Sequence, residues 1–207
     1  MMNCISLLES TAGRLLEVIE SQPGVRQIPT KDYGWENHRF IGPSFRLAHI
    51  ELFNQDRFCV VHACVFPHAT DPAPIYGFDV IAGESKITGV FMDLSPTAGD
   101  PYPFTQLDIG RSRDRPEWGQ IFSPYWLACR PTYDEMMVIS DEAVKVLETY
   151  LPTLGNVGDP LSIKDGQNRY CLNQQKNEHT RKALVKLLGE HGADEFMSDI
   201  LFPTIKD

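Results

Sequence analysis

Four ionisable side chains lie in segments of the chain that are otherwise apolar. His62 and Asp79 belong to the stretch CVVHACVFPHATDPAPIYGFDVIAG, residues 59–83, and His49 and Glu51 belong to RLAHIELF. An acid held beside a histidine in apolar surroundings has a shifted pKa, and a group with a pKa near neutrality donates protons well at physiological pH. These residue types therefore indicate proton-transfer chemistry, or a metal ion held by two imidazoles and two carboxylates.

A simpler interpretation is that each of these residues is an ordinary part of the fold. A single strand histidine is more often a hydrogen-bonded core residue than a catalyst, and a glutamate on an edge strand is normally solvated. Burying an acid in an apolar row without a purpose is costly, however, and four such groups together favour a functional role. We favour proton donation over metal binding, because ligands on separate strands cannot be identified from spacing alone.

Alternating apolar residues predict the strands that would position these groups. The alternation runs through FRLAHIELF (45–53), FCVVHACVF (58–66), PIYGFDVIAG (74–83) and ITGVFMDL (87–94), with short turns between the runs. Because successive strand side chains point to opposite faces, Phe45 and Leu47 should share a face with His49 and Glu51. An antiparallel meander can bring that row together with the rows of His62 and Asp79.

Helical patterns precede and follow this meander. We predict a helix over residues 5–19, a further strand within 119–131, a helix over 133–151, and two or three helical segments between 161 and 201. Strands followed by helices predict an α+β fold with a mainly antiparallel sheet covered by helices. At 207 residues the chain is expected to form one domain, residues 1–207.

Composition and missing motifs restrict the function further. The net charge of -9 argues against a general nucleic-acid or anionic-membrane binder, and the five scattered cysteines predict neither a disulfide framework nor a zinc site. No long apolar run or signal-peptide pattern occurs, so we expect a cytoplasmic protein. The dinucleotide-binding, P-loop and hydrolase-elbow motifs are all missing, so a redox enzyme of this sequence would need electrons from outside.

Six ordered blocks of sequence carry a resemblance to a known family. They are RLAHIELF, VVHACVFP, IYGFDVIAG, ITGVFMDLSPT, WGQIFSPYWL and QQKNEHTRKAL…FMSDILF. Over about residues 45–202 the chain resembles the ferredoxin-dependent bilin reductases, most closely the branch of phycocyanobilin:ferredoxin oxidoreductase. The resemblance implies a three-layer α/β/α sandwich that holds biliverdin IXα between a central antiparallel sheet and the C-terminal helices. It also implies that no metal or flavin is bound permanently, and that reduced [2Fe-2S] ferredoxin delivers single electrons while the protein protonates a bilin radical.

The resemblance places the catalytic residues on the four ionisable groups. The essential aspartate of the family falls on Asp79 and its histidine on His62. Its glutamate falls on Glu51, and the histidine two positions earlier falls on His49. We expect Asp79 to donate the first proton, His62 to share or relay it, and His49 with Glu51 to support the relay or to serve the second donation.

The propionate groups of biliverdin need donors or cations. By resemblance the candidate substrate-binding residues are Thr88, Arg113, Arg115, Asn177 and His179. His179 departs from the family pattern, in which a lysine is common at this position. The alternative interpretations are a solvated loop around the two arginines and an ordinary helix cap at Asn177.

Ferredoxins are acidic, so their docking surface should be basic despite the negative total charge. The most concentrated positive residues are Arg111, Arg113 and Arg115 in one loop and Lys176, Arg181, Lys182 and Lys186 in or beside one helical stretch. Such runs are also common on faces that are merely solvated. We expect a monomer, because the strands show no conspicuous unpaired hydrophobic edge.

The product is predicted from two features that point in different directions. Glu51 and Asn177 are typical of phycocyanobilin formation, whereas the short N-terminus and the short loop after DLSPT resemble compact phage-associated members that form phycoerythrobilin. We favour phycoerythrobilin. A non-catalytic bilin carrier or lyase is the competing class of function, and it would need the apolar pocket but not Asp79 and His62.

Overall fold

A computed structural model describes residues 3–55, 57–98, 111–112, 114, 120 and 122–206, with only the backbone described at 111–112. Its centre is an antiparallel sheet of eight strands in the order β1-β2-β3-β4-β5-β6-β8-β7. The strands are β1 (Arg26–Ile28), β2 (Glu36–Ile41), β3 (Phe45–Gln55), β4 (Phe58–Pro67), β5 (Ile75–Gly83), β6 (Lys86–Ser95), β7 (Arg111–Ser112) and β8 (Leu127–Arg130). The predicted meander is therefore the centre of the sheet, from β3 to β6.

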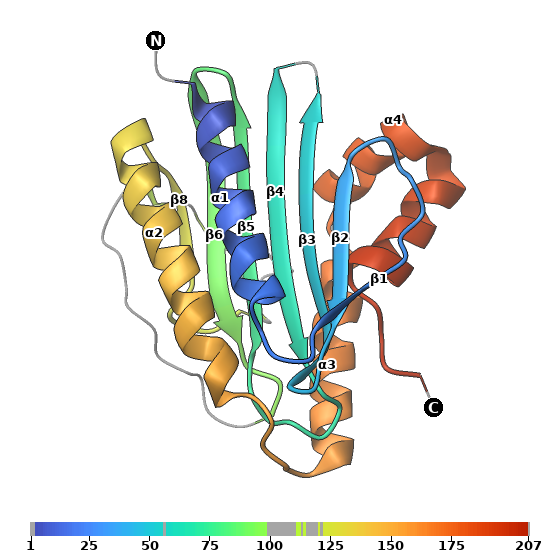
Figure 1. Cartoon of the computed structure of the whole chain (residues 1–207). Helices are drawn as coiled ribbons and strands as arrows, with labels where there is room; N and C mark the ends of the chain where they lie inside the picture. The colour runs from blue at the N-terminus through green and yellow to red at the C-terminus, as the bar shows by residue number, and fades with distance from the viewer. Residues whose placement is uncertain are drawn as a thin grey trace.

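Helices cover both faces of the sheet (Figure 1). One face carries α1 (Cys4–Glu20) and α2 (Tyr133–Tyr150), which continues into the 3-10 turn η2 (Leu151–Thr153). The opposite face carries α3 (Pro160–Gln174), α4 (Glu178–Glu195) and the π-helix η3 (Phe196–Leu201). The expected α+β three-layer sandwich is confirmed, and we call the face under α3 and α4 the site face.

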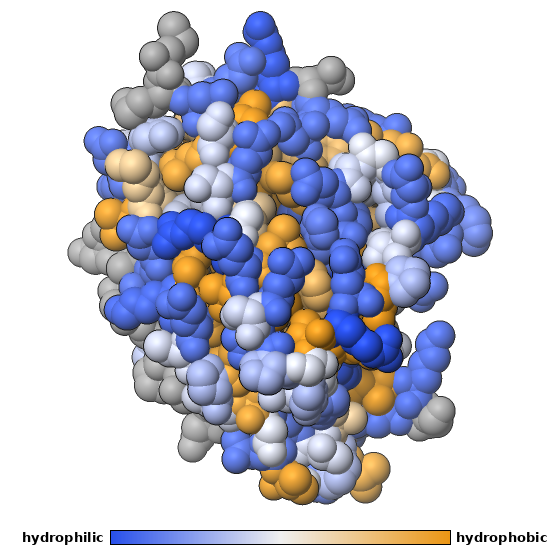
Figure 2. All heavy atoms as spheres, in the orientation of Figure 1, coloured by the Kyte–Doolittle hydropathy of each residue, from blue (hydrophilic) through white to orange (hydrophobic). Residues whose placement is uncertain are grey.

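Strand alternation divides the apolar residues into two cores. Val61 and Phe78 pack with Leu8 of α1 and Leu147 of α2 on one side of the sheet. The outer surface of these two helices, seen in Figure 2, is mainly hydrophilic, as expected for amphipathic helices. On the site face the second core gathers residues of β3, β4, β5, α3, α4 and η3. Among the described residues no helix is both long and apolar enough to cross a membrane.

The structure corrects the predicted sheet in three places. A bulge between Phe45 and Leu47 sends Phe45 into the core under α1 while Leu47 joins the site face, so strict alternation failed at this point. The strands β1 and β2 were not predicted, because polar residues such as Asn37 and Arg39 hide any alternation in β2. In the predicted strand 119–131 only Leu127–Arg130 is a strand among the described residues, since the preceding residues turn.

The close contact of α3 with the sheet layer gives a stability prediction. A Cβ added at Gly166 would lie 1.8 Å from the backbone oxygen of Thr97. We expect Gly166→Ala to lower the free energy of unfolding by about 2 kcal/mol, because the helix must move away from the backbone. The matched control is Gly13→Ala in α1, which meets no atom within 4 Å and should stabilise the protein slightly. Urea unfolding of both variants checks this, and equal stability of Gly166→Ala and the unchanged protein would contradict it.

Candidate active site

The strand register brings three of the ionisable residues into one row on the site face. Glu51 of β3 pairs with His62 of β4, and His62 pairs with Asp79 of β5. Directly paired residues of antiparallel strands project from the same face with their Cβ atoms close together. His49 lies two residues before Glu51 and so joins the same face. We call these four residues the acid–histidine row.

His62 and Asp79 form the closest pair of the row. Nδ1 of His62 lies 2.7 Å from Oδ1 of Asp79, and the His62 side chain is 8% exposed while that of Asp79 is 40% exposed. Burial lowers the pKa of His62, but the charges of Asp79 and Glu51 and the hydrogen bond to Asp79 raise it above its ordinary value overall. The pair can therefore hold a proton near neutral pH next to the more open carboxyl group.

Glu51 has a different environment from Asp79. It is 7% exposed, and burial raises its pKa to about 7, an effect that His62 partly opposes. A carboxyl group with this pKa carries a proton at neutral pH and can release it there. The row thus holds two carboxyl groups in contrasting surroundings, one open and one buried.

His49 is fully buried and hydrogen-bonded to a residue that the sequence analysis missed. Its Nε2 lies 2.6 Å from Oδ1 of Asn37 on β2. Because an amide oxygen can only accept a hydrogen bond, Nε2 is the protonated ring nitrogen, and its N–H donates a hydrogen bond to Oδ1 of Asn37. Burial, with the charges of His62 and Arg39, keeps the pKa of His49 well below its ordinary value, so the ring is neutral. The rings of His49 and His62 lie 5.4 Å apart.

The C-terminal segment covers His62. The Phe202 ring lies 5.7 Å from the His62 ring in an edge arrangement, and the Gln175 side chain donates to the Phe202 carbonyl at 2.9 Å. Asn168 of α3 holds the backbone of Ile205 through two hydrogen bonds. This cover keeps the imidazole dry, which strengthens its interaction with Asp79.

The predicted substrate-binding residues that the structure describes belong to two elements, β6 and the start of α4. Thr88 is exposed at a bulge of β6, where its hydroxyl donates to the Ile81 carbonyl at 3.2 Å. Asn177 is the N-cap of α4, and it accepts from the backbone N–H groups of His179 and Thr180. His179 is exposed. Arg113 and Arg115 lie outside the described residues.

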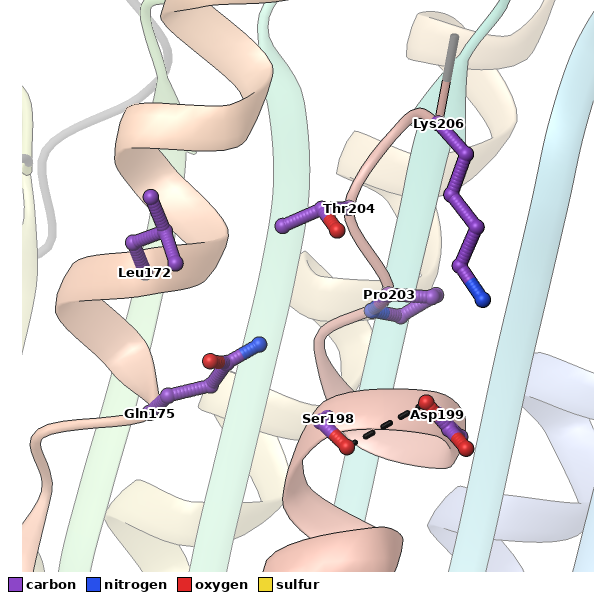
Figure 3. Close-up of a pocket in the computed structure, with 7 residues that line it drawn as sticks. All are labelled: Leu172, Gln175, Ser198, Asp199, Pro203, Thr204 and Lys206. Atoms are coloured by element: carbon purple, nitrogen blue, oxygen red, sulfur yellow. Dashed lines mark hydrogen bonds between the residues drawn. The ribbon is translucent and has the colours of Figure 1, made fainter.

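Two further observations concern a possible metal site and a hollow on this face. Within the described residues, no three His, Cys, Asp or Glu side chains are grouped so that they could hold a metal ion. A hollow of about 260 Å³ lies between α3, η3 and the C-terminal tail, lined among others by Leu172, Gln175, Ser198 and Asp199 (Figure 3). None of the predicted site residues lines it.

Comparison with known proteins decides the family. The sequence profile described as ferredoxin-dependent bilin reductase matches residues 14–203. The chain belongs to this family. The match includes the C-terminal part of α1 from residue 14, together with β1 and β2, which precede the region of the resemblance. The chain is therefore a ferredoxin-dependent bilin oxidoreductase, and its electrons come from ferredoxin.

Relatives and solved structures agree with this bilin reductase assignment. The phycocyanobilin:ferredoxin oxidoreductase of Trichodesmium erythraeum is 28% identical over 81% of this chain and 75% of its own length. The enzyme of the same name from Synechococcus elongatus is 30% identical over 83% and 77%. A solved structure of PcyX superposes with a TM-score of 0.71, 26% identity and coverage of 96% and 99%. Phytochromobilin synthase from tomato, solved in complex with biliverdin, shares the fold with a TM-score of 0.70, 14% identity and coverage of 95% and 82%.

Proposed function

We propose that this bilin reductase carries out the four-electron reduction of biliverdin IXα to a phycobilin. A [2Fe-2S] ferredoxin supplies the electrons one at a time, and the acid–histidine row supplies the protons to the bilin radical that each electron forms. One observation carries the proposal. Nδ1 of the buried His62 lies 2.7 Å from Oδ1 of the partly exposed Asp79, and Glu51 is paired with His62 on the neighbouring strand. A carrier that only binds the pigment has no need of this proton-holding pair.

The exposure of each group supports a separate role for it in this proposal. Asp79 is the most open member of the row and lies two residues from Gly77 on the site face, so it donates the first proton to the bilin. His62 then restores the proton on Asp79 through their shared hydrogen bond. Glu51 and His49 lie deeper and support this relay or the second donation.

We propose phycoerythrobilin as the product, with phycocyanobilin as the second candidate. The short loop after DLSPT favours the former, by resemblance to compact members of the family. The relatives named phycocyanobilin:ferredoxin oxidoreductase favour the latter. The two outcomes depend on which carbon receives a proton after each electron, and placements of about 1 Å govern that choice.

An anaerobic time course tests the proposal. The purified protein is mixed with one equivalent of biliverdin IXα, reduced ferredoxin and a ferredoxin-reducing system, and absorbance is followed before the pigment is extracted and chromatographed. A transient radical band followed by a blue-shifted product supports the reductase, and co-elution with one of the two phycobilins identifies the product. Tight binding with an unchanged pigment would instead indicate a bilin carrier or lyase. The cytoplasmic location and the monomeric state remain predictions.

Two of the predicted ferredoxin-docking residues, Arg181 and Lys182, are already paired with carboxylates. Arg181 forms two hydrogen bonds with Asp194, at 2.7 Å and 3.1 Å, and Lys182 lies 3.8 Å from Glu178. Lys176 and Lys186 are exposed and form no ion pair with a carboxylate among the described residues, while the side chain of Arg111 lies outside them. We therefore propose that ferredoxin docks on Lys176, in the turn before α4, and Lys186, in the middle of α4.

Charge reversal tests this docking surface. We expect the double variant Lys176→Glu/Lys186→Glu to raise the KM for ferredoxin about tenfold at low salt, because an acidic partner is then repelled. The effect should shrink at high salt, and bilin affinity should not change. The matched control is Lys145→Glu on α2, at the opposite face of the sheet. Equal KM values for the double variant and this control would place the docking surface elsewhere.

A further inference from the structure

An aromatic cluster covers the site face beside Glu51. The ring of Trp35, the residue before β2, lies 5.5 Å from that of Phe53 at an interplanar angle of 70°, and 5.4 Å from that of Phe196 in η3 at 62°. The Tyr33 ring lies 5.7 Å from Trp35 and 4.7 Å from Phe196. Trp35 and Tyr33 both pack against the apolar core of the site face. These tilted and edge contacts hold the Trp35 indole in one orientation.

The strand register places this indole on the same face as the Glu51 carboxyl group. Asn37 of β2 pairs with Glu51 of β3. Continuing the antiparallel register by two residues brings Trp35 opposite Phe53, in agreement with their ring contact. Side chains two residues apart in extended chain project to the same side, so Trp35 and Asn37 both face the acid–histidine row.

The indole nitrogen of Trp35 is a buried hydrogen-bond donor. Nε1 forms no hydrogen bond of good geometry with any group in the described part of the chain. It lies near enough to Glu51, however, that its N–H lowers the pKa of the carboxyl group, against the larger effect of burial. A carboxyl group becomes a much stronger acceptor when it ionises. The pairing is therefore weak while Glu51 holds its proton and strong once the proton has left.

Other ionisable groups act on Glu51 from the neighbouring strands. The charge of His62 on β4 also lowers the pKa of Glu51, and that of Asp79 on β5 raises it. His49 on β3 is neutral, because its pKa is well below the ordinary value. Three further charges act on the Tyr33 hydroxyl at the outer edge of the cluster, those of Arg39, Glu195 and Asp199. The indole N–H differs from all of these groups because it does not titrate near neutral pH and stays available as a donor.

We propose that Trp35 is a positioning residue for Glu51, whose indole N–H donates a hydrogen bond to the carboxylate that remains when Glu51 gives up its proton. The proton passes to the bilin radical, directly or through the relay with His62, while ferredoxin supplies the electron and the indole keeps its own hydrogen. The proposal rests on the proposed function for the acceptor of that proton. A donor that is already in place when the charge forms stabilises the charge without reorganisation, which favours release of the proton.

An infrared pH titration of the protein without pigment tests this pairing. The carbonyl band of protonated Glu51 is the one that Glu51→Gln removes, and in the unchanged protein it should disappear with a midpoint at about pH 7. We expect Trp35→Phe to move this midpoint upward by about one pH unit, because the aromatic contacts remain while the N–H is lost.

The direction of the shift separates this role from a structural one. If Trp35 only covered Glu51, the smaller phenylalanine ring would admit water, which lowers the pKa of a buried carboxyl group. An unchanged or lowered midpoint in Trp35→Phe would therefore overturn the proposal. The matched control is Tyr33→Phe, which removes one polar hydrogen from the same cluster and keeps the ring. Its midpoint should equal that of the unchanged protein, because the Trp35 N–H is still present.

A second measurement keeps Trp35 and so does not depend on the folding of Trp35→Phe. The chain has three tryptophans, so their indole N–H signals can be assigned one by one in NMR spectra. The Trp35 signal should move downfield as the pH rises through about 7, and it should not do so in Glu51→Gln. A Trp35 signal that does not titrate, or that titrates equally in Glu51→Gln, would also overturn the proposal.

Turnover tells the failure of this proposal apart from failure of the proposed function. With biliverdin IXα and reduced ferredoxin, Trp35→Phe should slow formation of the four-electron product about tenfold, and it should add no further loss in the Glu51→Gln background. A protein that shows both spectroscopic effects but never reduces biliverdin would disprove only the proposed function. A protein that reduces biliverdin without either effect would disprove only the role of Trp35.

Discussion

Replacing Asp79 by asparagine is expected to lower the rate of bilin reduction about a thousandfold, within the range that loss of a general acid produces. Asparagine keeps the size of the side chain and can still contact Nδ1 of His62, but it has no ionisable proton to donate. Bilin affinity should stay within about threefold of the unchanged protein, because the carboxyl group is not the main contact of an apolar pigment. Stopped-flow absorbance with reduced ferredoxin measures the rate, and a titration without ferredoxin measures the affinity.

A second readout separates proton donation from a loss of structure. Because the Asp79 charge helps to raise the pKa of His62, Asp79→Asn should lower that pKa, which NMR of the histidine ring can follow. The matched control is Asp165→Asn, an exposed aspartate of α3, which should change neither rate nor pKa. Reduction by Asp79→Asn at a normal rate would show that another group donates the first proton.

The grouping of the ionisable residues was predictable because strand alternation is a local property. His49 and Glu51 are two residues apart on one strand and therefore face the same side of the sheet. Short turns fix the order of β3, β4 and β5, so the meander alone brings His62 between Glu51 and Asp79. The same reasoning failed at Phe45, because a bulge depends on contacts with the partner strand that the sequence of β3 does not display.

The remaining parts of the site could not be read from local patterns. Asn37 supports His49 from β2, and nothing in the polar sequence of that strand marks it as a partner. Trp35 precedes β2, and only the fold reveals that its indole N–H lies near the Glu51 carboxyl group. Supporting residues of this kind can be identified only from tertiary contacts. The candidate catalytic residues can be identified from the sequence, because they are ionisable residues among apolar neighbours.

The two carboxyl groups of the row differ in their surroundings. Asp79 is 40% exposed and paired with His62, whereas Glu51 is buried, which raises its pKa to about 7. We propose that these two acids serve successive protonations. The protonation of the buried Glu51 carboxyl group can be followed through the pH dependence of the free energy of unfolding.

Glu51→Gln is expected to be more stable than the unchanged protein above pH 7, by on the order of 3 kcal/mol. The unfolded chain releases the Glu51 proton near the ordinary pKa of 4.5, whereas the folded protein holds it up to about 7. Between these values the folded state binds more protons, so the stability that Glu51 contributes is complete below pH 4.5 and is lost as the pH rises through 7. Glutamine resembles the protonated acid and removes that loss.

Urea unfolding across pH 5 to 9 on both proteins, with the exposed Glu17→Gln of α1 as the matched control, measures the difference. His62 also has a raised pKa and contributes a dependence of the same sign. The part of it that comes from Asp79 is common to all three proteins and cancels, whereas Glu51→Gln also removes the Glu51 charge that helps to raise the His62 pKa, which changes the comparison in the same direction. The Glu51→Gln curve should therefore separate from the unchanged protein only as the pH rises, while Glu17→Gln runs parallel to it. If all three curves stayed parallel, Glu51 would be ionised throughout this range, and the buried proton that we propose for the relay or the second donation would not exist.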